Sequence, residues 1–443
     1  MTTEQWAAWV RARVDPGTAF AKPEALDDLL VLDCSRASMA GLVASSFLAE
    51  LGAEVIRVEP PGGDPARHFA PFGLLHRDTG LGYLVEGRNK LHITLSLENP
   101  EGREILRSLA RRADVLIETF LPGQMDAWGL GYRQLFDANP PLIYCALYTY
   151  GQFGPRAGCG QPNADVADQA LSGVTFITGF PPGDGRARAA AKSEDLSAVP
   201  TRQGSWHGWT LGGLWGAFGI LVALHVRTQL GAGQFVDVSP AEALMRSADV
   251  SAAWWELDGV LRSRVGNYDT AIFPYTYVRC RDGYLLLAAV MEPAWQALCR
   301  LMGRSDLIEQ YPSIPSRRPL AVQSALHKEV EAWTTGLTFE EIAEKFEEGN
   351  RSIEGGVMVA GRVVELRDVV LNEHYRARGA LAVFTDPTYG DLLIQLPFQK
   401  LSATPPRLKW ACRTPGQDNA HIYAKYLGYG KEALAGLQAR GVI

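Results

Sequence analysis

Cysteine and histidine, the side chains that most often bind metals, are scattered in this sequence. The six cysteines form no C-x-x-C pair and the eight histidines form no H-E-x-x-H pair. Because zinc sites need such ligands at short, fixed spacings, the sequence predicts no metal site. Unpaired cysteines are typical of free, buried thiols in a reducing cytosol, so we expect a cytoplasmic protein.

Motifs that bind phosphate groups or activate a serine are missing as well. The turn that follows Asp33 reads CSRASMAG, without the G-x-G-x-x-G pattern of a dinucleotide site. The chain has no G-x-x-x-x-G-K-[ST] loop, which argues against phosphoryl transfer from ATP. It has no G-x-S-x-G elbow, which argues against an ordinary serine hydrolase.

Composition excludes several further classes of protein. The chain has 443 residues, 47% hydrophobic and 21% charged, and a formal net charge of −6, so it is an ordinary globular protein and not a non-specific DNA binder. Residues 1–20 include charged side chains and no apolar core, so we expect no secretory signal. The uncharged stretch 210–224 is about 15 residues long, short of the ~20 that a membrane span needs. We predict a buried core helix there and no membrane contact.

The chemistry must be positioned by alternating strands and helices. Continuous apolar runs at residues 29–32 and 55–58 flank a helical pattern at 41–51, which is a βαβ unit. The pattern continues with strands at 91–95, 115–117 and 142–147, and Asn99 followed by Pro100 begins a helix that runs to 112. The fold class is therefore α/β, with a Rossmann-like open parallel sheet in a large domain.

Composition also suggests where the chain divides. We expect an N-terminal extension at 1–25, whose helix places Trp6, Trp9 and Val10 on one face. The first part of the large domain spans 26–205, linker helices 206–259, a smaller α+β domain 260–365, and a return to the large domain 366–443. Residues 181–203 are rich in Gly, Ala, Arg and Ser and read as an exposed loop.

Eight phrases, in order, resemble the family III CoA-transferases, also called the CaiB/BaiF group. They are VLD (31–33), ELGAEVIRVEPPGGD (50–64), GRNK (87–90), DVLIETFLPG (114–123), GQFGP (151–155), DVADQALSG (165–173), GAGQFVDV (231–238) and GVI (441–443). The resemblance covers residues 26–443. It implies two interlocked protomers, each with a Rossmann-like large domain and a small domain.

The resemblance also implies a reaction, in which the carboxylate matching Asp165 takes the acyl group of an acyl-CoA. A thioester is electrophilic enough for a positioned carboxylate to attack without a general base. The resulting anhydride is opened by CoA to an aspartyl–CoA thioester, from which CoA passes to an acceptor acid. One thioester replaces another, so the CoA thioester is a substrate and no prosthetic group is required. Without the resemblance, an Asp near a helix start is more often an N-cap.

Other residues match family positions that contact CoA. Arg67, Arg88, Asn89 and Lys90 match positions near the CoA phosphates and adenine, although ordinary surface charge is an equal alternative. Phe120, Gly123 and Met125 lie on the loop after a strand, where ligands bind in open α/β sheets. Asp168 stands where the family usually has a small apolar residue, and we expect it to be solvated or ion-paired.

Several alternatives remain open. An acyl-CoA racemase shares the fold, but the positions of its acid and base are occupied here by Ala164 and Ser205, which favours the transferase. A non-catalytic subunit of a hetero-oligomer is the second alternative, since a CoA contact is missing at Ala127 and Trp128. Tryptophans gathered between Trp206 and Trp255 belong either to the core or to an aromatic pocket. In the second case, an aryl-substituted succinate is the predicted acceptor and succinyl-CoA the predicted donor. We expect either a homodimer or a hetero-oligomer, and no nucleic-acid partner.

Overall fold

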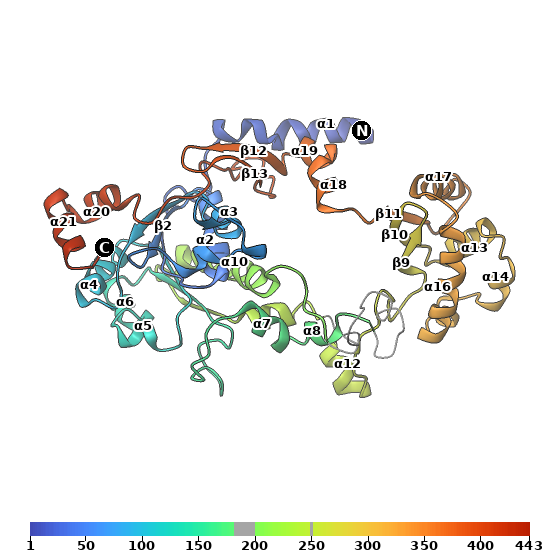
Figure 1. Cartoon of the computed structure of the whole chain (residues 1–443), viewed down its shortest axis with the longest axis horizontal. Coiled ribbons are helices and arrows are strands. Elements are labelled where there is room, and N and C mark those ends of the chain that lie inside the picture. The colour runs from blue at the N-terminus through green and yellow to red at the C-terminus, as the bar shows by residue number, and fades with distance from the viewer. Residues whose placement is uncertain (181–199, 249–250) are drawn as a thin grey trace. The chain divides into compact units, whose positions relative to one another are not determined.

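The computed structural model describes residues 1–180, 200–248 and 251–443. The described chain divides into two compact units (Figure 1). The first comprises Met1–Thr175, Arg202–Ala252 and Asn372–Ile443, and the second is formed mainly by residues 253–371. The sequence prediction places the domain boundaries at 205, 259 and 365. Most of the predicted loop, residues 181–199, lies outside the described residues.

A six-stranded parallel sheet forms the centre of the first unit. Its strands stand in the order β5-β2-β1-β6-β7-β8, which is the 3-2-1-4-5-6 order of a Rossmann-like sheet and confirms the predicted fold class. The strands are β1 (Leu30–Asp33), β2 (Glu54–Glu59), β5 (Lys90–Thr94), β6 (Val115–Glu118), β7 (Ile143–Leu147) and β8 (Phe235–Val238). The order in which successive strands are added reverses between β1 and β6, and ligands bind at this point in such sheets.

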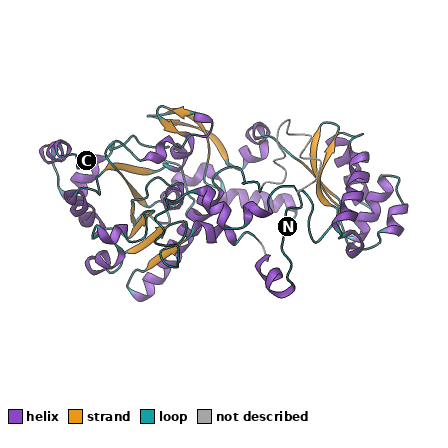
Figure 2. Cartoon of the chain, turned by 60° about the horizontal axis from the view of Figure 1, so that its bottom comes forward, coloured by secondary structure: helices purple, strands orange, loops and turns teal. Residues whose placement is uncertain are grey.

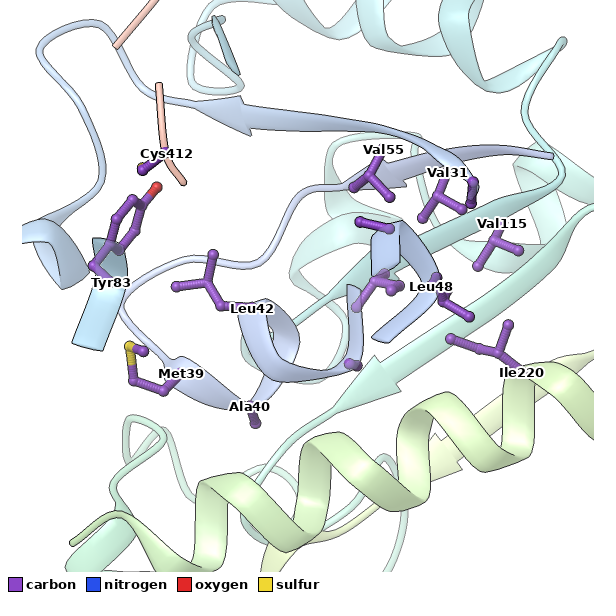
Figure 3. Packing of buried hydrophobic residues seen from close by; sticks show 14 of the residues in the cluster. Val31, Met39, Ala40, Leu42, Leu48, Val55, Tyr83, Val115, Ile220 and Cys412 are labelled. Atoms are coloured by element: carbon purple, nitrogen blue, oxygen red, sulfur yellow. The ribbon is translucent and has the colours of Figure 1, made fainter. Parts of the chain in front are cut away.

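Helices cover both faces of the sheet. On one face, Val31, Val55 and Val115 of three neighbouring strands pack with Leu48 of α2 and Ile220 of α10 (Figure 3). The other face is covered by α4, α20 and α21. The covering helices are α2 (Met39–Glu50), α4 (Pro100–Ala110), α10 (His207–Leu230), α20 (Asn419–Leu427) and α21 (Lys431–Ala439). Strands buried on both faces explain the uninterrupted apolar runs in the sequence.

Helix α10 is the predicted core helix. By length and composition it is apolar enough to cross a membrane. Its glycines lie against the fold, however: a Cβ on Gly213 would stand 2.6 Å from the Val43 side chain, and one on Gly212 would stand 2.7 Å from Pro240. The close approach to α2 therefore requires glycine. The opposite face carries Leu214, Phe218 and other apolar side chains that are exposed in the single chain.

A buried charge cluster ties the strand ends together. The Arg57 guanidinium lies 2.9 Å from the Asp33 carboxylate and 2.7 Å from the Asp64 carboxylate, and all three side chains are fully buried. The cation keeps the pKa of Asp33 below its usual value against the opposing effect of burial. Because each charge satisfies another, the cluster tolerates burial that a lone charge would not.

The second unit has its own sheet and core (Figure 2). Its antiparallel sheet has the order β11-β10-β9, and helices α13, α16 and α17 contribute to the core around Trp295 and Phe346. These elements are β9 (Tyr275–Cys280), β10 (Gly283–Ala288), β11 (Val359–Arg362), α13 (Glu292–Leu301), α16 (Leu320–Thr334) and α17 (Phe339–Asn350). The mixture of a small sheet and helices agrees with the predicted α+β character.

The remaining elements are short or peripheral. In the first unit they are α1 (Thr3–Val14), η1 (Pro16–Ala21), η2 (Pro65–His68), η3 (Pro71–Gly73), β3 (Leu75–His76), β4 (Thr79–Gly80), α3 (Leu81–Glu86), α5 (Gln124–Ala127), α6 (Tyr132–Ala138), α7 (Asp165–Leu171), α11 (Pro240–Met245), α19 (Glu373–Ala377), β12 (Leu381–Asp386) and β13 (Gly390–Gln395). The others are α8 (Val174–Ile177), α12 (Ser251–Asp258), α14 (Asp306–Gln310), α15 (Ile314–Arg317) and α18 (Leu366–Leu371). The predicted cap is present at Asn99, whose side chain accepts a hydrogen bond from the Glu101 amide.

Candidate active site

Asp165 is the first residue of α7, but its side chain does not cap that helix. The N-cap position belongs to Ala164, which makes no side-chain cap. Instead, Oδ1 of Asp165 accepts hydrogen bonds from the backbone amides of Gly208 at 2.8 Å and Trp209 at 3.2 Å. The residue is only 4% exposed. The carboxylate is therefore held by the N-terminus of a second helix, α10.

The position at the end of α10 suits a negative charge. Gly208 and Trp209 are the second and third residues of a 24-residue helix, so their amides have no partner within the helix. The aligned peptide dipoles place partial positive charge at the same end. Two backbone donors aimed at one oxygen are also the arrangement that stabilises an oxyanion in acyl transfer.

The second carboxylate oxygen is held by a side chain. Oδ2 of Asp165 accepts a hydrogen bond from Nε2 of Gln169 at 2.8 Å, one turn later on α7. Oε1 of Gln169 in turn accepts from the backbone amide of Gln203 at 2.9 Å. The two oxygens of Asp165 thus differ: one is bound to fixed backbone amides, and the other to a side chain that is able to rotate away.

Gly208 leaves room for Asp168. A Cβ on Gly208 would stand 2.5 Å from the Cβ of Asp168 and 3.1 Å from its Oδ2. Both distances are shorter than ordinary contacts, so no larger residue fits without moving one helix. Glycine at this position therefore lets α7 and α10 meet closely enough for Asp165 to reach the amides.

The prediction that Asp168 is solvated or ion-paired is wrong. Asp168 is fully buried, and neither carboxyl oxygen has a hydrogen-bond partner at ordinary distance in the described chain, so it is neither solvated nor ion-paired. Burial raises the pKa of Asp168 to about 7; the Thr149 hydroxyl opposes this rise and the nearby Asp165 carboxylate adds to it. A second carboxyl group thus lies beside the first and holds its proton into the neutral range.

The segment before Asp165 is tied to the carboxyl ends of two strands. Oδ1 of Asn163 accepts from the Thr149 amide at 2.7 Å, and its Nδ2 donates to the carbonyl oxygens of Thr119 at 2.8 Å and Leu147 at 3.2 Å. Thr119 follows β6, and Leu147 ends β7. Asn163 therefore fixes the start of α7 at the edge of the sheet where ligands bind.

A cavity of about 690 Å³ lies at the carboxyl ends of β7 and β8, beside α7. Its walls include Thr149 and Tyr150 after β7, Leu171 of α7, and Asp237 at β8. Among the described residues that line it, Arg156 is the one cation, and its guanidinium lies over the Tyr150 ring. This volume falls within the range of small-molecule sites.

Gly123 and Met125 line a second cavity, of about 260 Å³, together with Tyr132 and Tyr144. Glu118 also lines it, and burial raises the pKa of this carboxyl group to about 8. Gly123 is the N-cap residue of α5 and has a φ of 82°, a conformation that favours glycine. The structure thus brings Gly123 and Met125 together at the sheet edge.

Phe120 lies apart from this second cavity. Its ring packs edge-on against Trp128 at 5.1 Å between centroids, and its amide donates to Glu118. Trp128 stands beside Ala127, where the sequence departs from the family pattern. Phe120 lines a separate, smaller cavity together with Cys34 and Arg36.

The structure gives Arg67 and Arg88 partners inside the protein. Arg67 forms two hydrogen bonds of 2.6 Å to the Glu59 carboxylate, and Arg88 lies 3.0 Å from Glu50 and 2.7 Å from the Gln395 carbonyl oxygen. Both arginines are more than nine-tenths buried. They are therefore not ordinary surface charge, and in the single chain both are occupied in ion pairs.

Asn89 and Lys90 are buried in the same way. The Asn89 side chain donates to the Arg407 carbonyl oxygen at 2.7 Å and accepts from the Lys409 amide at 2.7 Å. Nζ of Lys90 donates to the Leu42 carbonyl oxygen at 2.7 Å. Asn89 thus holds the returning C-terminal segment against the sheet.

Aromatic side chains gather where α10 begins. Trp209 stacks on Phe69 at 5.6 Å between centroids and lies 6.1 Å from Trp206. Trp254 and Trp255, by contrast, belong to the second unit. Trp209 thus lies beside Asp165, and Trp206 lies next to Trp209. The gathered tryptophans are divided between the two units and do not form one group.

Sequence reasoning missed the groups that hold Asp165. Gln169 gave no signal, because glutamine one turn after an aspartate is common on helices. The sequence predicts Gly208 only as part of the linker helices and Trp209 only as one of the gathered tryptophans, and it places neither beside Asp165. Their role depends on a tertiary contact between segments that are about forty residues apart in the sequence. One signal was present: α10 begins without a capping side chain, so its first backbone amides need hydrogen-bond acceptors from elsewhere.

Comparison with known proteins identifies the family of the chain. The sequence profile of CoA-transferase family III matches residues 26–419. The chain is 32% identical to succinyl-CoA–D-citramalate CoA-transferase of Chloroflexus aurantiacus, over 95% of this chain and 98% of that protein. It is 31% identical to the alpha subunit of succinyl-CoA–L-malate CoA-transferase of the same species, covering 94% and 92%. A CaiB/BaiF family protein from Brucella suis superposes with a TM-score of 0.74 at 27% identity, covering 91% and 100%.

Proposed function

Because this chain belongs to CoA-transferase family III, we propose that Asp165 carries CoA from succinyl-CoA to a substituted succinic acid. The observation that supports this role most directly is the pair of backbone amides on Oδ1 of Asp165. The relatives named above use succinyl-CoA with D-citramalate or L-malate, and both acceptors are substituted succinates. The acyl-CoA and the organic acid are the substrates, and no prosthetic group is needed.

In the proposed first step, Oδ2 of Asp165 attacks the succinyl thioester carbonyl. Gln169 must release Oδ2, whereas Oδ1 keeps its two backbone donors. The tetrahedral oxyanion collapses, the carbon–sulfur bond breaks, and CoA leaves as a thiolate. The product is a mixed anhydride between Asp165 and succinate.

In the second step, the CoA thiolate attacks the carbonyl carbon of Asp165 and succinate leaves. The oxygen that becomes an oxyanion is now Oδ1 of Asp165, which already accepts from Gly208 and Trp209. A donor placed on such an oxygen contributes about 10²–10³ to the rate. The acceptor carboxylate then attacks the aspartyl thioester, and the same steps in reverse form the new acyl-CoA.

The acceptor we propose is an aryl-substituted succinate. Trp206, Trp209 and Phe69 form an aromatic cluster next to the amides that bind Asp165, and aromatic rings bind aryl groups by offset or edge contacts. The proposed CoA contacts are Phe120, Gly123 and Met125, at the switch point of the sheet. We place the enzyme in the cytoplasm.

The proposed assembly is an interlocked dimer of this chain or of this chain with a paralogue. The exposed face of α10 supports it, because Leu214, Phe218 and Val222 follow helical spacing and are at least 44% exposed in the single chain. A second candidate is a non-catalytic role for this chain beside a paralogous subunit. The relative that is an alpha subunit supports the hetero-oligomer that this role requires. Nothing at Ala164 or Ser205 supplies the acid–base pair of a racemase.

The test is CoA transfer by the purified chain, with succinyl-CoA as donor and 2-benzylsuccinate, L-malate or D-citramalate as acceptor. We expect kcat/KM to be highest for benzylsuccinate. Transfer to malate or citramalate alone would refute the aryl acceptor and keep the transferase. Transfer only after addition of a co-expressed paralogue would support the hetero-oligomer, and no transfer with either would refute the proposed reaction.

A further inference from the structure

The N-terminal extension builds a cleft with a part of the chain about 370 residues away. Helix α1 lies beside α19 (Figure 1), and residues of both line one cavity. The cavity between them has a volume of about 400 Å³. Its walls are Trp6, Ala7, Val10, Arg11, Val14, Asp15, Pro16, Ala377, Arg378 and Lys400. Since the family profile begins at residue 26, most of this wall is not part of the matched region.

The N-terminal extension is fixed to the rest of the chain near residues 16–22, whereas α1 itself remains exposed to solvent. Nζ of Lys22 donates to the carbonyl oxygens of Arg13 at 2.7 Å and Ser402 at 2.9 Å. Pro16 lies so close to Gly379 that a Cβ there would stand 2.7 Å away. Helix α1 nevertheless has no buried residue, and Trp6 is 54% exposed. A 12-residue helix is marginal alone, so contacts on its apolar face would stabilise it.

The apolar side of the cleft follows helical spacing. Trp6, Val10 and Val14 are four residues apart and therefore share one face of α1. A second cavity of about 280 Å³ shares Pro16 and Lys400 with the first, and its walls include Phe20 and Phe384. Lys400 thus lines two adjoining cavities that are mainly hydrocarbon.

The charges around the cleft are unbalanced. Arg11, Arg378 and Lys400 line it, against one carboxylate, Asp15. That carboxylate accepts a hydrogen bond from the Gly17 amide at 2.9 Å. In the described chain neither Arg11 nor Arg378 has a carboxylate partner, and the hydrogen bonds of Lys400 go to backbone carbonyl oxygens. Burial and the charge of Arg378 both lower the pKa of Lys400. Three cationic side chains thus face one carboxylate, and a bound anion would stabilise their excess positive charge.

We propose that this cleft binds an organic anion with a hydrocarbon or aryl body. Its charged group lies between Arg11, Arg378 and Lys400, and its body contacts Trp6 and the apolar cavity beyond Lys400. The volume fits this occupant, because sites for small molecules range from about 300 to 1,000 Å³ and combine apolar walls with a few placed polar groups. The site uses none of the residues that hold Asp165.

The test is a titration of the full chain with octanoate, in which binding is monitored by tryptophan fluorescence. The matched ligands are 1-octanol, which lacks the charge, and succinate, which lacks the apolar body. We expect saturable binding of octanoate that is about tenfold weaker in Lys400→Gln and in Arg378→Gln, the size of one charge-assisted hydrogen bond. Arg13→Gln is the control, because this guanidinium lies over the Trp9 ring and does not line the cleft.

Three outcomes would overturn the proposal. They are equal binding of octanol and octanoate, equal weakening by Arg13→Gln and Lys400→Gln, and no saturable signal with octanoate. A change of sedimentation coefficient in Arg378→Gln without ligand would assign the cleft to a second copy of the chain instead. Arg378 is exposed, so its variant stays informative if Lys400→Gln fails to fold.

Discussion

Replacing Gly208 with alanine should separate the positioning of Asp165 from its chemistry. The added Cβ would stand 2.5 Å from the Cβ of Asp168, and neither atom is at the end of a flexible side chain. The start of α10 and helix α7 must therefore move apart. The Gly208 and Trp209 amides, which bind Oδ1 of Asp165, move with α10.

The expected cost to stability is modest and the expected cost to the rate is large. Overpacking by one methyl group destabilises a fold by about 1–3 kcal/mol. Loss of one oxyanion donor lowers a rate by about 10²–10³. We therefore expect Gly208→Ala to lower kcat for CoA transfer by about a hundredfold, while the chain still folds and KM for succinyl-CoA changes little.

The assay is steady-state CoA transfer together with thermal unfolding of each variant. Gly204→Ala is the control, because its Cβ would meet no atom within 4 Å. In the double variant Gly208→Ala with Asp168→Gly the clashing Cβ is gone, so part of the lost rate should return. Full activity of Gly208→Ala, or an equal loss in Gly204→Ala, would refute the reasoning.

Three further predictions concern single side chains. Asp165→Asn should abolish transfer and keep nearly the natural thermal midpoint, since the asparagine side chain also accepts hydrogen bonds from helix amides. Asp165→Ala should abolish transfer and also lose about 1 kcal/mol of stability. A stable and active Asp165→Asn would contradict this. The pKa of Asp168 is raised to about 7 in the folded chain, so the folded chain holds this proton more tightly than the unfolded chain does. The stability that the protonated carboxyl group contributes is therefore fully present below pH ~4 and is lost as the pH rises to about 7. Urea unfolding should therefore show Asp168→Asn gaining stability relative to the natural chain between pH 4 and 7, and a constant difference would count against a buried acid. Arg57→Met should cost about 3–5 kcal/mol in urea unfolding, because it leaves the Asp33 and Asp64 carboxylates buried without their cation, and a loss below 1 kcal/mol would contradict this ion-pair account.

The sheet was predictable from the sequence because its signals are local. Apolar runs such as residues 29–32 and 55–58 mark strands buried on both faces, and the Asn99–Pro100 pair marks a helix start. Each signal depends on a few neighbouring residues. The strand order then follows from the βαβ connections, which leave few topologies open.

The site was less predictable because its contacts are distant in sequence. The position of Asp165 came from a family resemblance, while its partner amides in α10 lie more than forty residues further along the chain. Burial cannot be read from residue type either: Arg67 and Arg88 look like surface charge, and the structure pairs them internally with Glu59 and Glu50. Asp168 was misjudged for the same reason.

The most direct test of the account is intact-mass spectrometry of the chain mixed with succinyl-CoA, with and without hydroxylamine. We predict a CoA adduct, converted by hydroxylamine to a hydroxamate, which peptide mapping places on Asp165 and which is absent from Asp165→Asn. An adduct that persists in Asp165→Asn, or CoA transfer without any adduct on Asp165, would contradict the proposal that this carboxylate carries CoA.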